Sequence, residues 1–177
     1  EEAEVWRRFQ EIVKPAAAAN NKILEVSGKV QEMDILNPAG FLIALQSFRG
    51  DHYKLESSAA ELILTGKAFK GGEDPAACAF GAWLAGFSTK NARVAALVEE
   101  IRPLHAVFHR HVGEIKRAVA GGRAKEAADI FARRLIPAAE GVFAKFDGMR
   151  AEAQASADVF AAMVSLGMGE ARAKTNE

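Results

Sequence analysis

The sequence predicts an all-α fold, an antiparallel up-down four-helix bundle with one short inserted helix that carries the only cysteine. Apolar residues recur at alternating spacings of four and three in four long segments, as in helices that bury one face in a bundle. Short breaks separate the segments, and short connections favour antiparallel neighbours. Half of the 177 residues are hydrophobic, which predicts one core and a single domain over residues 1–177.

The first two predicted helices meet at Asn37 and Pro38. Asparagine is a favoured N-cap, and proline suits the first helical position, where its missing N–H would be unpaired. The helix before this break carries a regular apolar series: Val5, Phe9, Ile12, Ala16, Ala19, Ile23, Val26, Val30 and Met33. The helix after it carries Phe41, Leu45, Phe48, His52, Leu55, Ala59 and Leu62. His52 therefore lies on an otherwise apolar face.

Glycine and proline mark the remaining breaks. Gly71–Gly72 is expected to end the second helix, and Asp74–Pro75 to begin the short helix with Cys78, which Gly86 ends. Gly121–Gly122 separates the last two long helices. The third carries Val94, Val98, Ile101, His105, Phe108, Val112, Ile115 and Val119, and the fourth Phe131, Leu135, Ala138 and Val142. Alternating directions would place both chain ends at one end of the bundle. Three prolines fall inside predicted helices, Pro15, Pro103 and Pro137, and each is expected to remove a helical hydrogen bond and bend the bundle.

Charge and composition exclude several classes of function. Lysine plus arginine equal aspartate plus glutamate, 23 against 23, so the sequence predicts no nucleic-acid partner. No apolar run is long enough to span a bilayer. The chain begins at Glu1 and ends in a helix-forming run, and we expect it to be a piece of a longer protein. Motifs for haem, phosphate loops or paired catalytic carboxylates do not occur, so we expect no enzymatic activity.

Four residues indicate a metal site: His52, Cys78, His105 and His109. His105 and His109 are four apart, so their rings project from one helical face. Three imidazoles and a thiolate form a tetrahedral ligand set for Zn²⁺. The alternative makes each histidine a hydrogen-bonded core residue and Cys78 a small hydrophobe or free thiol. We favour the metal, because three separate explanations would otherwise be needed for polar groups on apolar faces.

The fourth histidine, His111, projects about 200° away from His109 and is not expected to be a ligand. A closed sphere of four protein ligands argues against hydrolytic catalysis. Asp51, Glu56 and Glu100 are within sequence reach as acceptors for the ring N–H groups, although an exposed charged face is the more common setting for each.

The same residues resemble a known family. A helical histidine is followed by Cys78-Ala79-Phe80-Gly81-Ala82-Trp83 and then by the His105–His109 pair. This is similar to the chemoreceptor zinc-binding (CZB) family, whose pattern is a histidine, a Cys-x-[Leu/Phe]-Gly-x-Trp box and a His-x-x-x-His pair. The resemblance covers about residues 48–149 and leaves the first helix and the C-terminal tail outside. Leu55 stands where many members have an aromatic residue.

The resemblance implies a zinc site of three histidines and one cysteine in a commonly homodimeric regulatory domain of bacterial signalling proteins. In such domains the zinc-bound cysteine is implicated in responses to zinc and to oxidants. We therefore expect a sensory domain of a methyl-accepting chemotaxis receptor, in the extracytoplasmic (periplasmic) part of the inner-membrane protein and tethered to membrane-spanning helices. Zinc or oxidant status of Cys78 would be coupled to helix rearrangement.

Three alternatives stay open. The first is a cytoplasmic zinc-responsive module of a diguanylate cyclase or similar signalling protein. The second is a metal-dependent enzyme with an open coordination position, in which His111 or a carboxylate replaces Cys78. The third is a structural bundle in which zinc is a staple and its binding energy contributes to folding.

Overall fold

The computed structural model describes the backbone of residues 1–175 and the side chains of residues 1–166, and all its regular elements are helices. The helices are α1 (Glu2–Met33), α2 (Pro38–Thr65), α3 (Ala79–Gly86), α4 (Ala92–Ala120), α5 (Ala124–Ile130) and α6 (Ile136–Thr175). A 3-10 turn, η1 (Pro75–Ala77), precedes α3, and a π-helical segment, η2 (Phe131–Leu135), joins α5 to α6 without a break. The all-α class, the four long helices and the short inserted helix are confirmed.

Side-chain caps begin the helices where the sequence indicates. Asn37 Oδ1 accepts a hydrogen bond from the amide of Gly40 at 2.9 Å, and Pro38 follows at the start of α2. Asn91 Oδ1 caps α4 by accepting from the amide of Val94 at 2.9 Å. The predicted end of the second helix is wrong. Gly66, at φ 75°, ends α2 five residues before Gly71, because it adopts the left-handed conformation and its N–H bonds to a carbonyl of the last turn.

The predicted distortion near Pro137 takes the form of η2, whereas α1 and α4 continue as α-helices through Pro15 and Pro103. The amide of Ile136 bonds to the carbonyl of Phe131, five residues back, so the chain is locally wound as a π-helix just before the proline. A π bulge is one of the recognised ways in which a long helix accommodates a break in its hydrogen-bond ladder.

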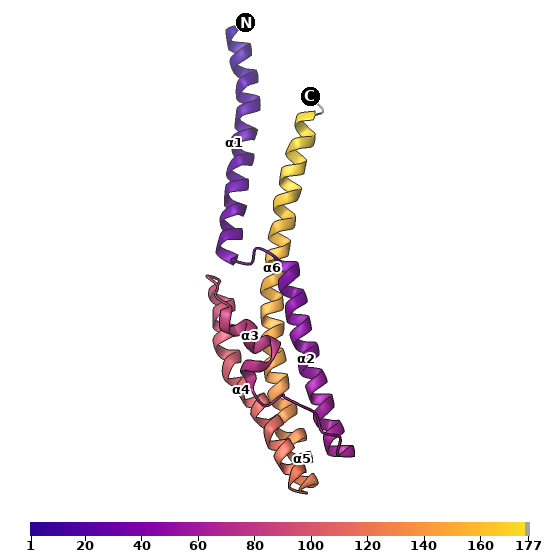
Figure 1. Cartoon of the computed structure of the whole chain (residues 1–177). Helices are drawn as coiled ribbons and strands as arrows, with labels where there is room; N and C mark the ends of the chain where they lie inside the picture. The colour runs from indigo at the N-terminus through magenta and orange to yellow at the C-terminus, as the bar shows by residue number, and fades with distance from the viewer. Residues whose placement is uncertain (176–177) are drawn as a thin grey trace.

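The predicted up-down alternation of the four long helices is wrong at two of their three connections, because only the step from α4 to α6 reverses the direction of the chain (Figure 1). The last helix, α6, is antiparallel to the other three long helices, while α1 lies end to end with α2, and α2 and α4 run the same way. The loop of residues 66–74 and α3 return the chain along the length of α2, and this return makes α4 parallel to α2. As predicted, the start of α1 and the described end of α6 lie at one end of the molecule.

The core lies where α2, α3, α4 and α6 pack together, and it is rich in phenylalanine. Its fully buried large side chains include Phe80, Ile101, Phe108, Ile115, Leu135, Phe146 and Met149. At the other end of the molecule α1 packs beside α6 (Figure 1), and α1 leaves a set of large apolar side chains exposed: Val5, Trp6, Phe9, Ile12, Val13 and Leu24. Among the described residues, no helix combines the length and apolar character that crossing a bilayer requires.

Candidate metal centre

The four residues singled out in the sequence converge in the core. His52 comes from α2, Cys78 precedes α3, and His105 and His109 are one turn apart on α4. Their ligand atoms all lie within 4.8 Å of one another. The three imidazoles are buried and the thiol is half-buried. The chain thus brings together a group of side chains that can hold a metal ion.

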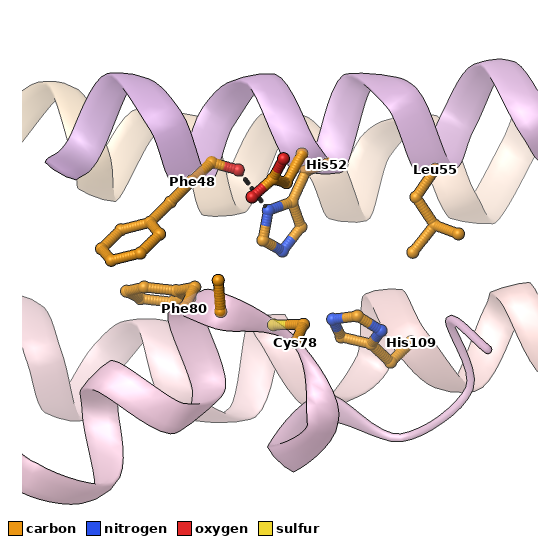
Figure 2. A pocket seen from close by; sticks show the side chains of 8 residues that line it. Phe48, His52, Leu55, Cys78, Phe80 and His109 are labelled. Atoms are coloured by element: carbon orange, nitrogen blue, oxygen red, sulfur yellow. Dashed lines mark hydrogen bonds between the residues drawn. The ribbon is translucent and has the colours of Figure 1, made fainter. Parts of the chain in front are cut away.

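Backbone contacts set the orientation of His52. Its Nδ1 lies 2.7 Å from the carbonyl oxygen of Phe48, one turn earlier in α2 (Figure 2). A carbonyl can only accept, so Nδ1 carries the proton and Nε2 keeps its lone pair. That Nε2 is buried and has no hydrogen-bond partner. A buried acceptor without a donor is uncommon in proteins, and a cation between the four side chains would satisfy it.

A second backbone carbonyl orients His109. Its Nδ1 lies 2.7 Å from the carbonyl oxygen of Gly72, so His109 also presents an unprotonated Nε2 to the cluster, 2.9 Å from Nε2 of His105. Gly72 has a φ of 93°, and a Cβ there would collide with the side chain of Leu55. Glycine is therefore required at this position, both for its conformation and for its closeness to α2.

Cys78 lies at the junction of η1 and α3 rather than within the short helix, a correction to the sequence prediction. It is the N-cap of α3, with an extended backbone, because η1 ends at Ala77. Its Sγ accepts a hydrogen bond from the amide of Gly81 at 3.2 Å and lies 3.2 Å from Nε2 of His105. A Cβ on Gly81 would overlap the carbonyl oxygen of Pro75, so glycine permits the tight turn that presents the thiol.

Burial governs the protonation of the cluster. It lowers the pKa of His52 and of His109 below the usual value of 6.5. Burial, followed by the nearby His109 and His52, lowers the pKa of His105 to about 3. Burial raises the pKa of the Cys78 thiol, and the amides of Gly81 and Phe80 oppose it only in part. At neutral pH the three imidazoles are neutral and can act as metal ligands, whereas the thiol needs a nearby cation to ionise.

The spacing of the ligand atoms is compatible with a single ion. Tetrahedral bonds of 2.0–2.3 Å place neighbouring ligand atoms roughly 3.3–3.6 Å apart. The distances of 2.9 and 3.2 Å around His105 Nε2 are close to that spacing, so a small outward movement of these side chains makes room for the ion.

An aromatic layer surrounds the cluster on one side, and an opening reaches it on another. Four phenylalanine rings lie around His52, those of Phe80, Phe108, Phe143 and Phe146, and the ring of Phe48 packs against Phe80. The opening has a volume of about 30 Å³, enough for a water molecule, and its wall includes Asp51, His52, Cys78 and His109 (Figure 2). The opening therefore admits a molecule of the size of water beside the half-buried thiol, and the buried His52 and His109 form part of the same wall.

Residues outside the cluster complete the comparison with the sequence. His111 is buried away from it, with Nδ1 2.8 Å from a carboxylate oxygen of Glu114. The Nδ1–H groups of His52 and His109 donate to the backbone carbonyls of Phe48 and Gly72 and not to the carboxylates suggested from the sequence. Asp51 pairs instead with Lys54, and Glu100 with Lys145. Sequence reasoning missed both carbonyls. Only the one from Phe48 carried a signal, because it is four residues before His52 in a helix.

Comparisons with protein-family models, with curated proteins and with solved structures found no match to this chain. The class that fold and site define is thus an all-α bundle with a buried cluster of three histidines and one cysteine that can hold a metal ion.

Proposed function

We propose that this chain is a zinc-binding sensory domain of a bacterial chemoreceptor, as the resemblance to the CZB family implies. The observation that carries the proposal is the convergence of three imidazoles and one thiol around the unpartnered Nε2 of His52. Nitrogen and sulfur ligands in a tetrahedral arrangement favour Zn²⁺ over hard cations such as Mg²⁺ or Ca²⁺. A bound Zn²⁺ ion would supply the charge that holds Cys78 as a thiolate.

Cys78 is the residue that suits a sensing role. It is half-buried beside the opening, whereas the three histidines are buried. A metal-bound thiolate remains a nucleophile toward two-electron oxidants. With hypochlorous acid the thiolate sulfur bonds to the chlorine and hydroxide leaves with the electron pair of the O–Cl bond. Water then displaces chloride from the sulfur and loses a proton, and Cys78 becomes a sulfenic acid. The sulfenic acid is a poorer ligand, so α3 and its loop would lose one attachment to α2 and α4.

The helix that would transmit such a change is α6. Phe146 of α6 has its ring centroid 4.8 Å from that of Phe80, two residues after Cys78, and 6.2 Å from that of His52. A shift of α3 or of the His52 ring therefore changes the surface against which α6 packs. Closely packed aromatic rings adjust by moving as bodies rather than by compressing.

The remaining parts of the proposal are homodimerisation and an extracytoplasmic, membrane-tethered position. The exposed apolar side chains of α1 offer a surface that a second copy would cover. Both described ends of the chain lie at one end of the molecule, an arrangement that suits tethering to two membrane-spanning helices (Figure 1).

Elemental analysis of the purified protein tests the metal directly. We expect about one zinc per chain in the wild type and a reduced content in Cys78→Ala and His105→Ala, with His111→Ala as the matched control that keeps its zinc. No metal in the wild type, and none taken up on addition of zinc, would overturn the proposal. A receptor chimera with a chemotaxis output then tests signalling, which Cys78→Ala is expected to abolish.

A structural zinc staple is the second candidate, because the site joins α2, α3 and α4 in the middle of the core. The two functions predict different responses of the protein when a chelator withdraws the zinc. A sensor keeps its helical circular dichroism and changes its tertiary contacts, whereas a stapled bundle unfolds as a whole. Circular dichroism together with tryptophan fluorescence separates the two outcomes.

A further inference from the structure

One face of α4 continues beyond the two histidines. His105, His109, Gly113 and Lys116 follow one another at spacings of four, four and three, so they form a single stripe along the helix. His105 and His109 face the metal centre. Gly113 and Lys116 face the loop of residues 66–78, which connects α2 to α3 and delivers Cys78.

Lys116 binds this loop at several points. Its Nζ donates to the carbonyl oxygen of Gly71 at 2.6 Å and to a carboxylate oxygen of Glu73 at 2.7 Å. The same ammonium lies 4.2 Å from the centroid of the Phe69 ring. The Lys116 side chain is 17% exposed, far less than most lysines on the surface of this chain. A single, mostly buried ammonium thus contacts three alternate residues of the loop.

Close packing and charge reinforce these contacts. A Cβ added at Gly113 would lie 3.4 Å from Cγ of Glu73, so the loop rests directly on α4 at that point. Burial alone would raise the pKa of Glu73, but the hydrogen bond and charge of Lys116 outweigh it and lower the pKa. Glu73 is therefore ionised at neutral pH and forms an ion pair with Lys116.

The residue between the two attachment points is Gly72, whose carbonyl accepts the hydrogen bond from His109 Nδ1. Gly71 and Gly72, at φ values of 73° and 93°, have backbone freedom that no side chain restricts. Something outside these glycines must fix the direction of the Gly72 carbonyl. Lys116 is placed to do so, since it binds the residues immediately before and after Gly72.

We propose that Lys116 is a positioning residue of the metal centre. It acts through residues 71–73, which hold His109 in the Nδ1–H tautomer and set the path of the chain toward Cys78. This inference rests on the metal centre of the proposed function, but it concerns a residue that contacts none of the four ligands.

The test compares three variants of the full chain. Lys116→Met removes the donor and keeps the aliphatic length, and Lys116→Arg keeps donors for both oxygens. Lys67→Met is the matched control, because Lys67 also belongs to the loop but pairs with Glu61 and has a 70% exposed side chain. Zinc affinity is measured by competition with a chromophoric chelator. The tautomer of His109 is measured in metal-free protein from its ¹⁵N chemical shifts.

Lys116→Met is expected to weaken zinc binding about tenfold, the lower end of the effect of removing a partner of a metal-bound histidine. It should also change His109 from the Nδ1–H form to a mixture of tautomers. Lys116→Arg should recover most of both properties, and Lys67→Met should match the wild type.

Two results would overturn the inference: unchanged affinity and tautomer in Lys116→Met, or a loss of melting temperature with no change in either. If the wild type binds no zinc, the proposed function fails instead, and the tautomer of His109 in Lys116→Met still decides whether Lys116 positions that ring.

Discussion

The sulfur of Cys78 lies 3.2 Å from Nε2 of His105 and, at the same time, accepts the first hydrogen bond of α3 from Gly81. One atom therefore begins a helix and closes the metal cluster. Because one sulfur atom makes both contacts, replacing Cys78 changes both the start of α3 and the cluster. A substitution that keeps the hydrogen bond from Gly81 but not the thiolate separates the two effects.

Cys78→Ser and Cys78→Ala are expected to differ in metal-free protein and to agree in zinc binding. Serine is a favoured N-cap and keeps the bond from Gly81, whereas alanine removes it and lowers the free energy of unfolding by about 0.5–1 kcal/mol. Both variants lose the thiolate and bind zinc more weakly than the wild type. Urea unfolding in the presence of a chelator measures the first effect and chelator competition the second. Equal stability of the two metal-free variants would show that the cap contributes nothing.

The second prediction concerns the short connection before α3. Gly81→Ala is expected to destabilise the protein by about 1–3 kcal/mol, because its Cβ would overlap the carbonyl oxygen of Pro75 and the backbone must move. Zinc affinity should fall with it, since η1 carries Cys78 into place. Gly86→Ala is the matched control in the same helix, where a Cβ meets nothing within 4 Å. Thermal unfolding measures the melting temperatures of the two variants. Equal melting temperatures would contradict the assigned role of Gly81.

The stability of the metal-free protein is expected to decrease in mildly acidic solution. The folded-state pKa values of His52, His105 and His109 lie below the usual 6.5, that of His105 at about 3. The unfolded chain therefore binds protons first as the pH falls, so stability is complete above about pH 6.5 and is lost progressively from there toward the folded-state values. Urea unfolding with chelator at pH 7.5, 6.5 and 5.5 measures the slope.

His105→Phe should reduce that slope, because one of the three titrating groups is gone. A wild-type stability that stayed level across this range would mean that the imidazoles accept protons in the folded state as readily as in the unfolded chain.

A fourth prediction concerns Glu56 on α2. Burial, and then the charge of Glu140, raises the pKa of Glu56 above its usual 4.5, and its Oε1 is buried without a hydrogen-bond partner. The ionised form therefore destabilises the folded state at neutral pH, and the folded state holds the proton more tightly. Glu56→Gln should raise the melting temperature at pH 7, with a difference that shrinks to nothing below about pH 4.5. Glu61→Gln is the exposed control. An equal or lower melting temperature of Glu56→Gln at pH 7 would refute the assignment.

The helices and the shared face of His105 and His109 were predictable because both depend on local spacing. The four-three alternation places apolar residues on one face of each helix, and His105 and His109 share a face whatever lies around them. The path of the chain between α2 and α4 was not predictable in this way. It depends on contacts between distant residues, such as Lys116 with Gly71 and Asn91 with the carbonyl of Met33, which periodicity does not encode.

The backbone acceptor for His109 escaped prediction for the same reason. Nothing in the sequence around Gly72 indicates that its carbonyl turns toward α4, because glycine permits many conformations and tertiary contacts select one. The early end of α2 at Gly66 was missed for another reason. Gly66 and the Gly71–Gly72 pair are both helix stop signals in the sequence, and the prediction chose the later one.

None of the four clustered side chains comes from α6, although Phe146 of α6 packs against His52 and Phe80. From Phe146 to Thr175 the helix continues for a further 29 residues, roughly 44 Å at 1.5 Å per residue. In a stiff helix of that length, a small change of angle at one end produces a large displacement of the other end. A tilt of about 5° at the aromatic contact would displace the far end by about 4 Å over that length, a distance comparable to the width of a side chain.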